Sequence, residues 1–208
     1  MLTQVRVANP SAVSAQDGTV IDQLAGKSGE SLYSQFHGKY YSQASRGNLF
    51  MAHAIVTAPV IYTTAAGTGG PLIWNGSTTH NVVLLAAGYG VTVVTTVAAA
   101  LGITGAGGQT VAPTSTTAID STTNMLLGGA ASRATSYRVG TPLAAGTFLL
   151  PFADVHTGAL TTEPGSLHWI DLAGAIVCPP NRWVSLAASA TATTAVAQLA
   201  IVWEEVPV

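Results

Sequence analysis

The chain contains a long stretch almost without charge, and this stretch limits the folds and surfaces that the chain can form. Between Arg46 and Arg133, Asp120 is the single charged side chain, and Thr, Ala, Gly and Val dominate the remainder. Charged residues make up 8% of all 208 residues, against roughly 25% in an average globular protein. Because a soluble monomer usually covers its surface with charge, we expect other copies or other proteins to cover part of this chain.

Short runs of strand-forming residues, separated by Gly, Pro and Asn, follow Arg46. The chain is long enough for one good core, and this many short strands predict an all-β fold, an antiparallel β-sandwich or a barrel. We expect residues 47–208 to form this domain and residues 1–46 to form an N-terminal arm or short helix region. The predicted strands are 49–56, 60–64, 82–85, 91–97, 135–139, 147–155, 167–172, 175–178, 183–188 and 195–204.

Two of these strands and one loop carry more detailed predictions. The last strand is apolar on both faces except for Gln198 and Glu204, so we expect the partner sheet to cover one face and a loop or a neighbouring subunit to cover the other. Pro151 cannot donate to a ladder, which places the strand 147–155 at an edge or a bulge. Residues 105–129 are low in bulky side chains and are expected to form a long loop that acts as a contact arm.

A membrane helix is the main alternative for residues 82–103. This segment carries no charge, and its length is close to the roughly 20 residues that a helix needs to cross a bilayer. Three glycines and three threonines lie within this segment, and no Lys or Arg flanks it to set an orientation. We therefore interpret it as strands with a break near Gly88 to Gly90, and expect no membrane partner.

Catalytic, metal and cofactor sites find little support in the residue pattern. Asp154 and His156 are one plausible metal pair, whereas zinc catalysis needs three converging ligands. No phosphate-binding loop or serine nucleophile motif is present in the sequence, and the adjacent Glu204 and Glu205 would point to opposite faces of a strand. We expect no enzyme activity, no metal and no cofactor. Cys178, the only cysteine, is expected to be a small buried apolar residue.

Aromatic and basic residues gather before the uncharged stretch. The net charge of −2 gives no broad basic field, so we expect no nucleic-acid partner. Tyr and Arg are enriched at protein interfaces, and these side chains can pin an arm to a sheet or to an adjacent protomer. The predicted interface residues are Tyr33, Phe36, His37, Tyr40, Tyr41 and Arg46.

Three parts of the chain resemble a group of tailed-bacteriophage virion proteins. They are the run from His37 to Phe50, HGKYYSQASRGNLF, the Gly, Thr and Ala-rich region after it, and the ending IVWEEV. The C-terminal segment GAIVCPPNRWVSLAASA is similar to that group as well. This resemblance implies a non-enzymatic structural protein with a jelly-roll-like sandwich on the virion. It carries no catalytic residues, and it leaves open whether the protein lies on the head or on the tail.

Two functions remain as hypotheses. The leading one is a capsid decoration or cement protein, a homotrimer on the capsid surface that binds the major capsid protein and stabilises the head. The alternative is a tail, baseplate or fibre component that binds a host-surface glycan. In that alternative, Trp74, Asn75 and His80 are the candidate sugar contacts, although a tryptophan such as Trp74 is more often a core residue.

Overall fold

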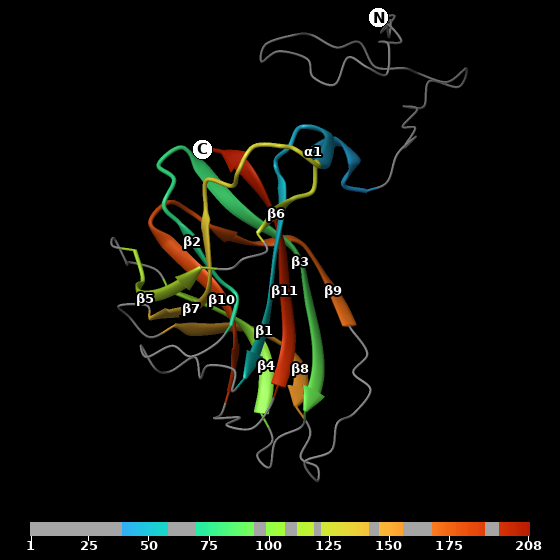
Figure 1. The fold of residues 1–208 in the computed structure, drawn as a ribbon, viewed down its shortest axis with the longest axis vertical. Coiled ribbons are helices and arrows are strands. Elements are labelled where there is room, and N and C mark those ends of the chain that lie inside the picture. Colours follow the sequence, from blue (N-terminus) through green and yellow to red (C-terminus); the bar gives the residue numbers. More distant parts are fainter. Residues whose placement is uncertain are drawn as a thin grey trace, which may run out of the picture.

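Two antiparallel sheets pack face to face in the computed structural model of the protein (Figure 1). The structure describes residues 39–57, 70–93, 99–106, 112–118, 122–141, 146–155, 168–189 and 196–208. In order, the elements are α1 Tyr41–Ser45, β1 Leu49–Thr57, β2 Leu72–Asn75, β3 His80–Val93, β4 Ala99–Ala106, β5 Thr114–Ala118, β6 Thr123–Asn124, β7 Thr135–Thr141, β8 Thr147–Val155, β9 His168–Cys178, β10 Arg182–Ala188 and β11 Val196–Pro207.

The strand order is that of a jelly roll. The first sheet has the order β6-β1-β11-β3-β9 and the second has the order β5-β7-β2-β10-β4-β8. From β1 to β4, and again from β8 to β11, the chain alternates between the two sheets, which gives the eight strands and two Greek keys of this fold. Strands β5, β6 and β7 are an insertion between β4 and β8 that lengthens both sheets on one flank. The predicted all-β, jelly-roll-like sandwich is thereby confirmed.

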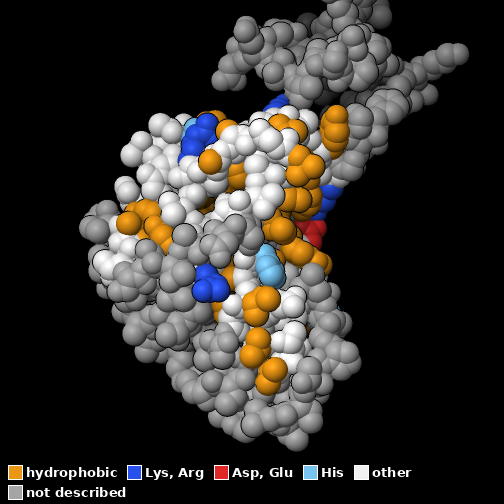
Figure 2. Space-filling view, viewed as in Figure 1, with side chains coloured by type: hydrophobic (Ala, Val, Ile, Leu, Met, Phe, Trp, Pro, Cys, Tyr) orange, Lys and Arg blue, Asp and Glu red, His pale blue; other side chains and the backbone are white. Residues whose placement is uncertain are grey.

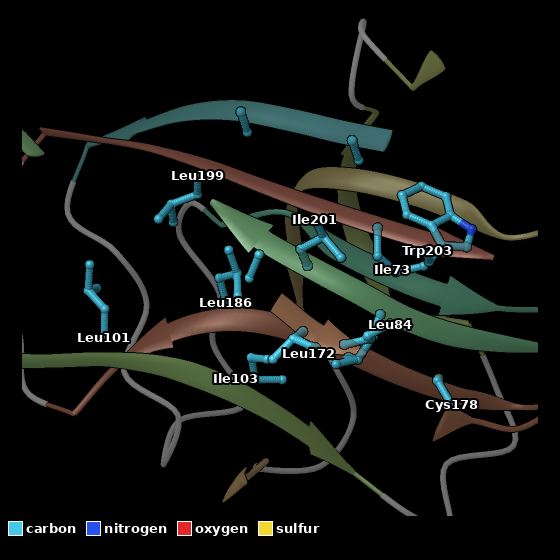
Figure 3. Packing of buried hydrophobic residues seen from close by; sticks show 14 of the residues in the cluster. Ile73, Leu84, Leu101, Ile103, Leu172, Cys178, Leu186, Leu199, Ile201 and Trp203 are labelled. Atoms are coloured by element: carbon cyan, nitrogen blue, oxygen red, sulfur yellow. The ribbon is translucent and has the colours of Figure 1, made fainter. Parts of the chain in front are cut away.

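The core lies between the sheets, and alternation along β11 explains why. Ala197, Leu199, Ile201 and Trp203 are each 0% exposed, as the apolar side of this strand predicts. Figure 3 shows Leu199, Ile201 and Trp203 on β11 within the core that Leu84 of β3 and Leu186 of β10 also form. The ring of Trp203 stacks on Phe50 of β1 with centroids 5.9 Å apart. These contacts fix the sandwich on which the surface features described below are mounted.

The uncharged segment 82–103 contributes to two strands, β3 and β4. The expected break near Gly88 is wrong, because β3 continues to Val93. A Cβ atom at Gly88 would lie 3.1 Å from the ring of Trp169, so this glycine makes room for an aromatic side chain of β9 rather than for a turn. Within the described ranges, no helix is long and apolar enough to cross a membrane.

Other strand boundaries also differ from prediction. The two predicted strands 167–172 and 175–178 fall on one strand, β9 His168–Cys178, and the expected interruption is a bulge at Ala173 and Gly174, which have φ of 48° and 80°. The predicted loop over 105–129 is wrong in part, because β4 runs to Ala106 and β5 and β6 follow. Strands β2, β4, β5 and β6 lie where no strand was predicted. The predicted strand 60–64 and the region 17–25 lie outside the described residues.

The edge prediction for β8 is confirmed. This strand ends the second sheet, and Pro151 pairs with Gly102 at a register shift. Because the proline sits at an irregular edge, its missing N–H costs no ladder bond in the sheet interior.

Candidate interaction surface

The start of the described chain is fixed to the edge strand β9 by Asp171. The Tyr40 hydroxyl donates to Oδ1 of Asp171 over 3.1 Å, and the Lys39 ammonium pairs with Oδ2. The backbone N–H of Ala173 donates to the same Oδ1 over 3.0 Å. The hydrogen bond from Lys39 is the largest cause that lowers the pKa of Asp171, and the bond to Asp171 likewise raises the pKa of Lys39. Tyr40 therefore pins the segment to its own sheet.

The other predicted interface residues are distributed around the same end of the molecule. Tyr41 lies on α1 and is half-exposed. Arg46 is exposed, and its charge opposes the burial that raises the pKa of Glu204 on β11. Tyr33, Phe36 and His37 lie outside the described residues. The structure thus brings Tyr40 to β9 and leaves much of the Tyr41 side chain accessible.

The outer face of the five-stranded sheet is rich in apolar side chains. Figure 2 shows them gathered along the side formed by β1, β11 and β3. Ile55 of β1 is 55% exposed, Trp169 of β9 is half-exposed, and Val202 of β11 is partly buried. The described residues therefore leave this second face partly open, and its predicted cover by a loop or a neighbouring subunit stays a prediction.

An apolar tip projects from the turn after β6. Met125, Leu126 and Leu127 are 44%, 41% and 89% exposed, and we call these three residues the tip. Asn124 orders the turn, because its Nδ2 donates to the carbonyl oxygens of Gly47 and Ala130 over 2.9 and 2.8 Å. Its Oδ1 accepts from the N–H of Leu126 over 2.9 Å. The tip is thus an ordered projection rather than a side effect of a loose loop.

Glu205 holds the other end of the same loop. Its side chain is 1% exposed, and Oε1 accepts from the Ser132 hydroxyl at 2.6 Å and from the backbone N–H groups of Arg133 and Ala134 at 2.9 and 3.2 Å. Nη1 of Arg133 donates to Oε2 over 3.2 Å. A buried carboxylate is tolerated only when it is paired and hydrogen-bonded, as this one is. Glu205 therefore ties the insertion to the central strand β11.

A pocket of about 310 Å³ opens between the sheets on the flank formed by the edge strands β8 and β9. We call it the inter-sheet pocket. Its lining is mostly apolar and comprises Gly105, Ala106, Thr147, Leu149, Ile176, Val177, Cys178, Pro179, Arg182, Trp183 and Val184. Leu149 and Val177 are half-exposed there. Burial raises the pKa of the Cys178 thiol to about 12, so this cysteine is the buried apolar residue that the sequence predicts.

The candidate sugar contacts are placed differently from a binding loop. Trp74 and Asn75 lie in β2 and are 6% and 0% exposed. The Asn75 amide donates to the carbonyl oxygens of His80 and Cys178, each over 2.9 Å. Burial and these bonds give Asn75 a structural role in joining three strands. They remove Trp74 and Asn75 from any surface that could meet a glycan.

The metal hypothesis gains no support from the described part of the chain. No group of three His, Cys, Asp or Glu residues there could hold a metal ion. The side chain of Asp154 and the whole of His156 lie outside what the structure describes. His168 instead stacks on Tyr89, with ring centroids 5.2 Å apart.

Sequence reasoning missed Asp171, the tip and the pocket. The run MLLGG at residues 125–129 was a visible signal for the tip, because three large apolar residues before two glycines are unusual in a surface loop. Asp171 and the pocket had no such signal, since each depends on strands that are distant in the sequence.

Comparisons of the chain with protein families, with curated proteins and with solved structures found no match.

Proposed function

We propose that this chain is a structural protein of a tailed-bacteriophage virion, a decoration or cement protein on the capsid surface. In this proposal it associates with itself as a trimer, binds the major capsid protein and has no enzymatic role. The strand order supports the proposal, because jelly rolls are a frequent architecture of viral capsid proteins, although lectins and cupins share it. The resemblance of residues 37–50 to virion proteins is its second support.

The observation that carries the proposal is the amount of apolar surface left open on a chain with almost no charge. Exposed side chains lie on the outer sheet face, at the tip and beside the pocket. A contact that buries on the order of 1,000 Å² of this surface gives a favourable hydrophobic term without salt bridges. Repetition over a closed shell adds avidity, because each further contact forms at a high effective concentration. Weak single contacts would in this way stabilise a head filled with DNA.

Binding to tail-less heads tests this proposal. Purified chain is mixed with heads that lack it, and we expect stoichiometric cosedimentation. The Tyr40→Ala, Tyr41→Ala double variant should lower occupancy while the sandwich stays folded, as judged by circular dichroism. Because Tyr40 contacts Asp171 in the same chain, Asp171→Asn is the control that removes this tether and keeps both tyrosines.

The outcomes separate the possible roles. Full occupancy by the double variant would remove the tyrosines from the interface. Absence of head binding by the unaltered chain would overturn the decoration role, and binding on a glycan array would favour the tail or fibre role. Glycan binding through Trp74 and Asn75 is not proposed, because both side chains are buried.

A further inference from the structure

The tip and the inter-sheet pocket are matched in chemistry and opposite in shape. The tip is convex and uncharged, and Leu127 at 89% exposure is held out by an ordered turn. Two bonds fix that turn to the sandwich: the Met125 N–H donates to the Leu49 carbonyl over 2.9 Å, and Asn124 Nδ2 donates to the Gly47 carbonyl over 2.9 Å. A third bond closes the turn itself, from the Gly129 N–H to the Leu126 carbonyl over 2.8 Å. A leucine that is held exposed to water gains no packing contacts within its own chain, so a partner that covers it would be favourable.

The pocket has the size and lining for such a side chain. Its volume of about 310 Å³ corresponds to the space of about ten waters and lies at the small end of the roughly 300–1,000 Å³ range of ligand clefts. No acidic residue lines it, and Arg182 is the single charged residue of the lining. Half-exposed Leu149 and Val177 belong to this lining as well. These walls suit a few apolar side chains better than a cation or a polar ligand.

One molecule cannot fill its own pocket with its own tip. The tip follows β6, the first strand in the order β6-β1-β11-β3-β9, and the pocket lies beside β9, the last. Four strand spacings of about 4.8 Å separate these edges by about 19 Å. The bonds of Asn124 and Met125 hold the tip at its own edge. A second copy placed edge to edge, in contrast, presents its tip on the side where the first presents its pocket.

We propose that the tip of one copy inserts into the inter-sheet pocket of the next copy, with Leu127 as the anchor. The contact is heterologous, because one copy contributes its tip and the neighbouring copy contributes its pocket. Such contacts close into a ring when the rotation between copies permits, and otherwise they extend into filaments. This inference deepens the proposed function, since self-association is part of it, and it names the surfaces that would build a trimer.

Sedimentation of single variants tests each side of the contact. Lysine is the chosen substitution because Arg182 in the pocket lining would repel it, whereas an aspartate would gain a partner. We expect Leu127→Lys and Val177→Lys each to weaken self-association at least tenfold. Val208→Lys is the matched control, because Val208 is a 71% exposed apolar residue outside both surfaces. This control should associate like the unaltered chain.

Mixing the two variants distinguishes this contact from a symmetric one. Leu127→Lys keeps an intact pocket and Val177→Lys keeps an intact tip, so the mixture should form a complex that neither variant forms alone. Circular dichroism verifies folding, and Leu149→Gln replaces Val177→Lys if that variant unfolds. An unaltered chain that stays monomeric, a Leu127→Lys chain that associates normally, or a mixture that fails to associate would overturn the inference.

Head binding is measured separately, so that the two proposals can fail separately. A chain that associates through its tip but leaves heads unbound would keep this inference and refute the decoration role. A chain that binds heads as a monomer would refute this inference and keep the decoration role.

Discussion

Glu205 is the residue on which the inserted loop most depends. Its buried carboxylate accepts from Ser132, Arg133 and Ala134, so Glu205→Ala leaves several donors unsatisfied. We expect that variant to lose about 2–4 kcal/mol in the free energy of unfolding, because each buried donor left without its acceptor costs about 1–3 kcal/mol. Glu205→Gln keeps an acceptor and should lose less. Urea denaturation measures both, with the partly exposed neighbour Glu204→Gln as the control. An unchanged midpoint for Glu205→Ala would show that the loop does not rely on this carboxylate.

Asp171 gives the attachment of the N-terminal segment a defined pH range. Its pKa is lowered from 3.8, so the contribution of the charged form is present above that value and is lost as the pH falls through the lower folded pKa. The pKa of Lys39 is raised from 10.5, so its contribution is present below that value and is lost at higher pH. The tether should therefore hold between about pH 4 and pH 10.5 and weaken in salt, because both groups are exposed.

Limited trypsin digestion measures this tether directly. Asp171→Asn should speed cleavage after Lys39 several-fold at neutral pH, because the ammonium loses its charged partner. Cleavage after Arg133 in the same molecule is the internal reference, since that residue bonds to Glu205 instead. Equal acceleration at both sites would indicate general loosening of the sandwich and would contradict a local role for Asp171.

At the scale of elements, glycines decide how closely neighbouring strands approach. A Cβ atom at Gly102 of β4 would lie 2.3 Å from Cζ of Phe148 and 2.5 Å from the carbonyl oxygen of Leu150, so the neighbouring backbone would have to move. At Gly88 of β3 the nearest atoms belong to the Trp169 side chain at 3.1 Å, and that side chain is half-exposed.

This difference predicts unequal costs for the same substitution. We expect Gly102→Ala to lower the free energy of unfolding by about 1–3 kcal/mol, as overpacking does in cores. Gly88→Ala should cost less, because the ring can shift toward solvent. Thermal and urea denaturation compare the two. A larger loss for Gly88→Ala would mean that Trp169 is held more firmly than β8.

At the scale of the whole molecule, the two flanks of the sandwich differ. One flank ends in β6 and carries the tip, and the other ends in β8 and β9 and carries the pocket. A molecule with two different flanks is suited to head-to-tail association. Irregular edges, with Pro151 in β8 and the bulge of β9, limit uncontrolled strand addition at the pocket flank.

Salt should therefore have little effect on self-association. Charged contacts weaken as the ionic strength rises, whereas burial of apolar side chains does not. We expect the association constant from sedimentation equilibrium to change less than about threefold between 0.1 and 1 M sodium chloride, and to hold or rise in sulfate. Dissociation at high salt would show that charged groups such as Lys39 or Arg46, rather than the tip, hold the copies together.

The sequence alone determined the all-β class, most of the strands and the nature of the surface. Alternation along residues 196–203 identified the buried side of β11, and Pro151 identified an edge, because both signals are local to one strand. The near absence of charge between Arg46 and Arg133 also comes from the sequence alone, and its prediction that other copies or other proteins cover part of the chain stays a prediction.

Only the tertiary structure decided which distant residues meet. The sequence predicts a break near Gly88, but Gly88 lies inside β3 and Gly102 lies inside β4. At these positions Trp169 and Phe148 from other strands occupy the space that a Cβ would need. The partnership of Tyr40 with Asp171 and the separation of tip and pocket depend on strand order. Strand order is fixed by pairing between segments that are distant in the sequence, such as β1 with β11 and β4 with β8, and no local pattern encodes it.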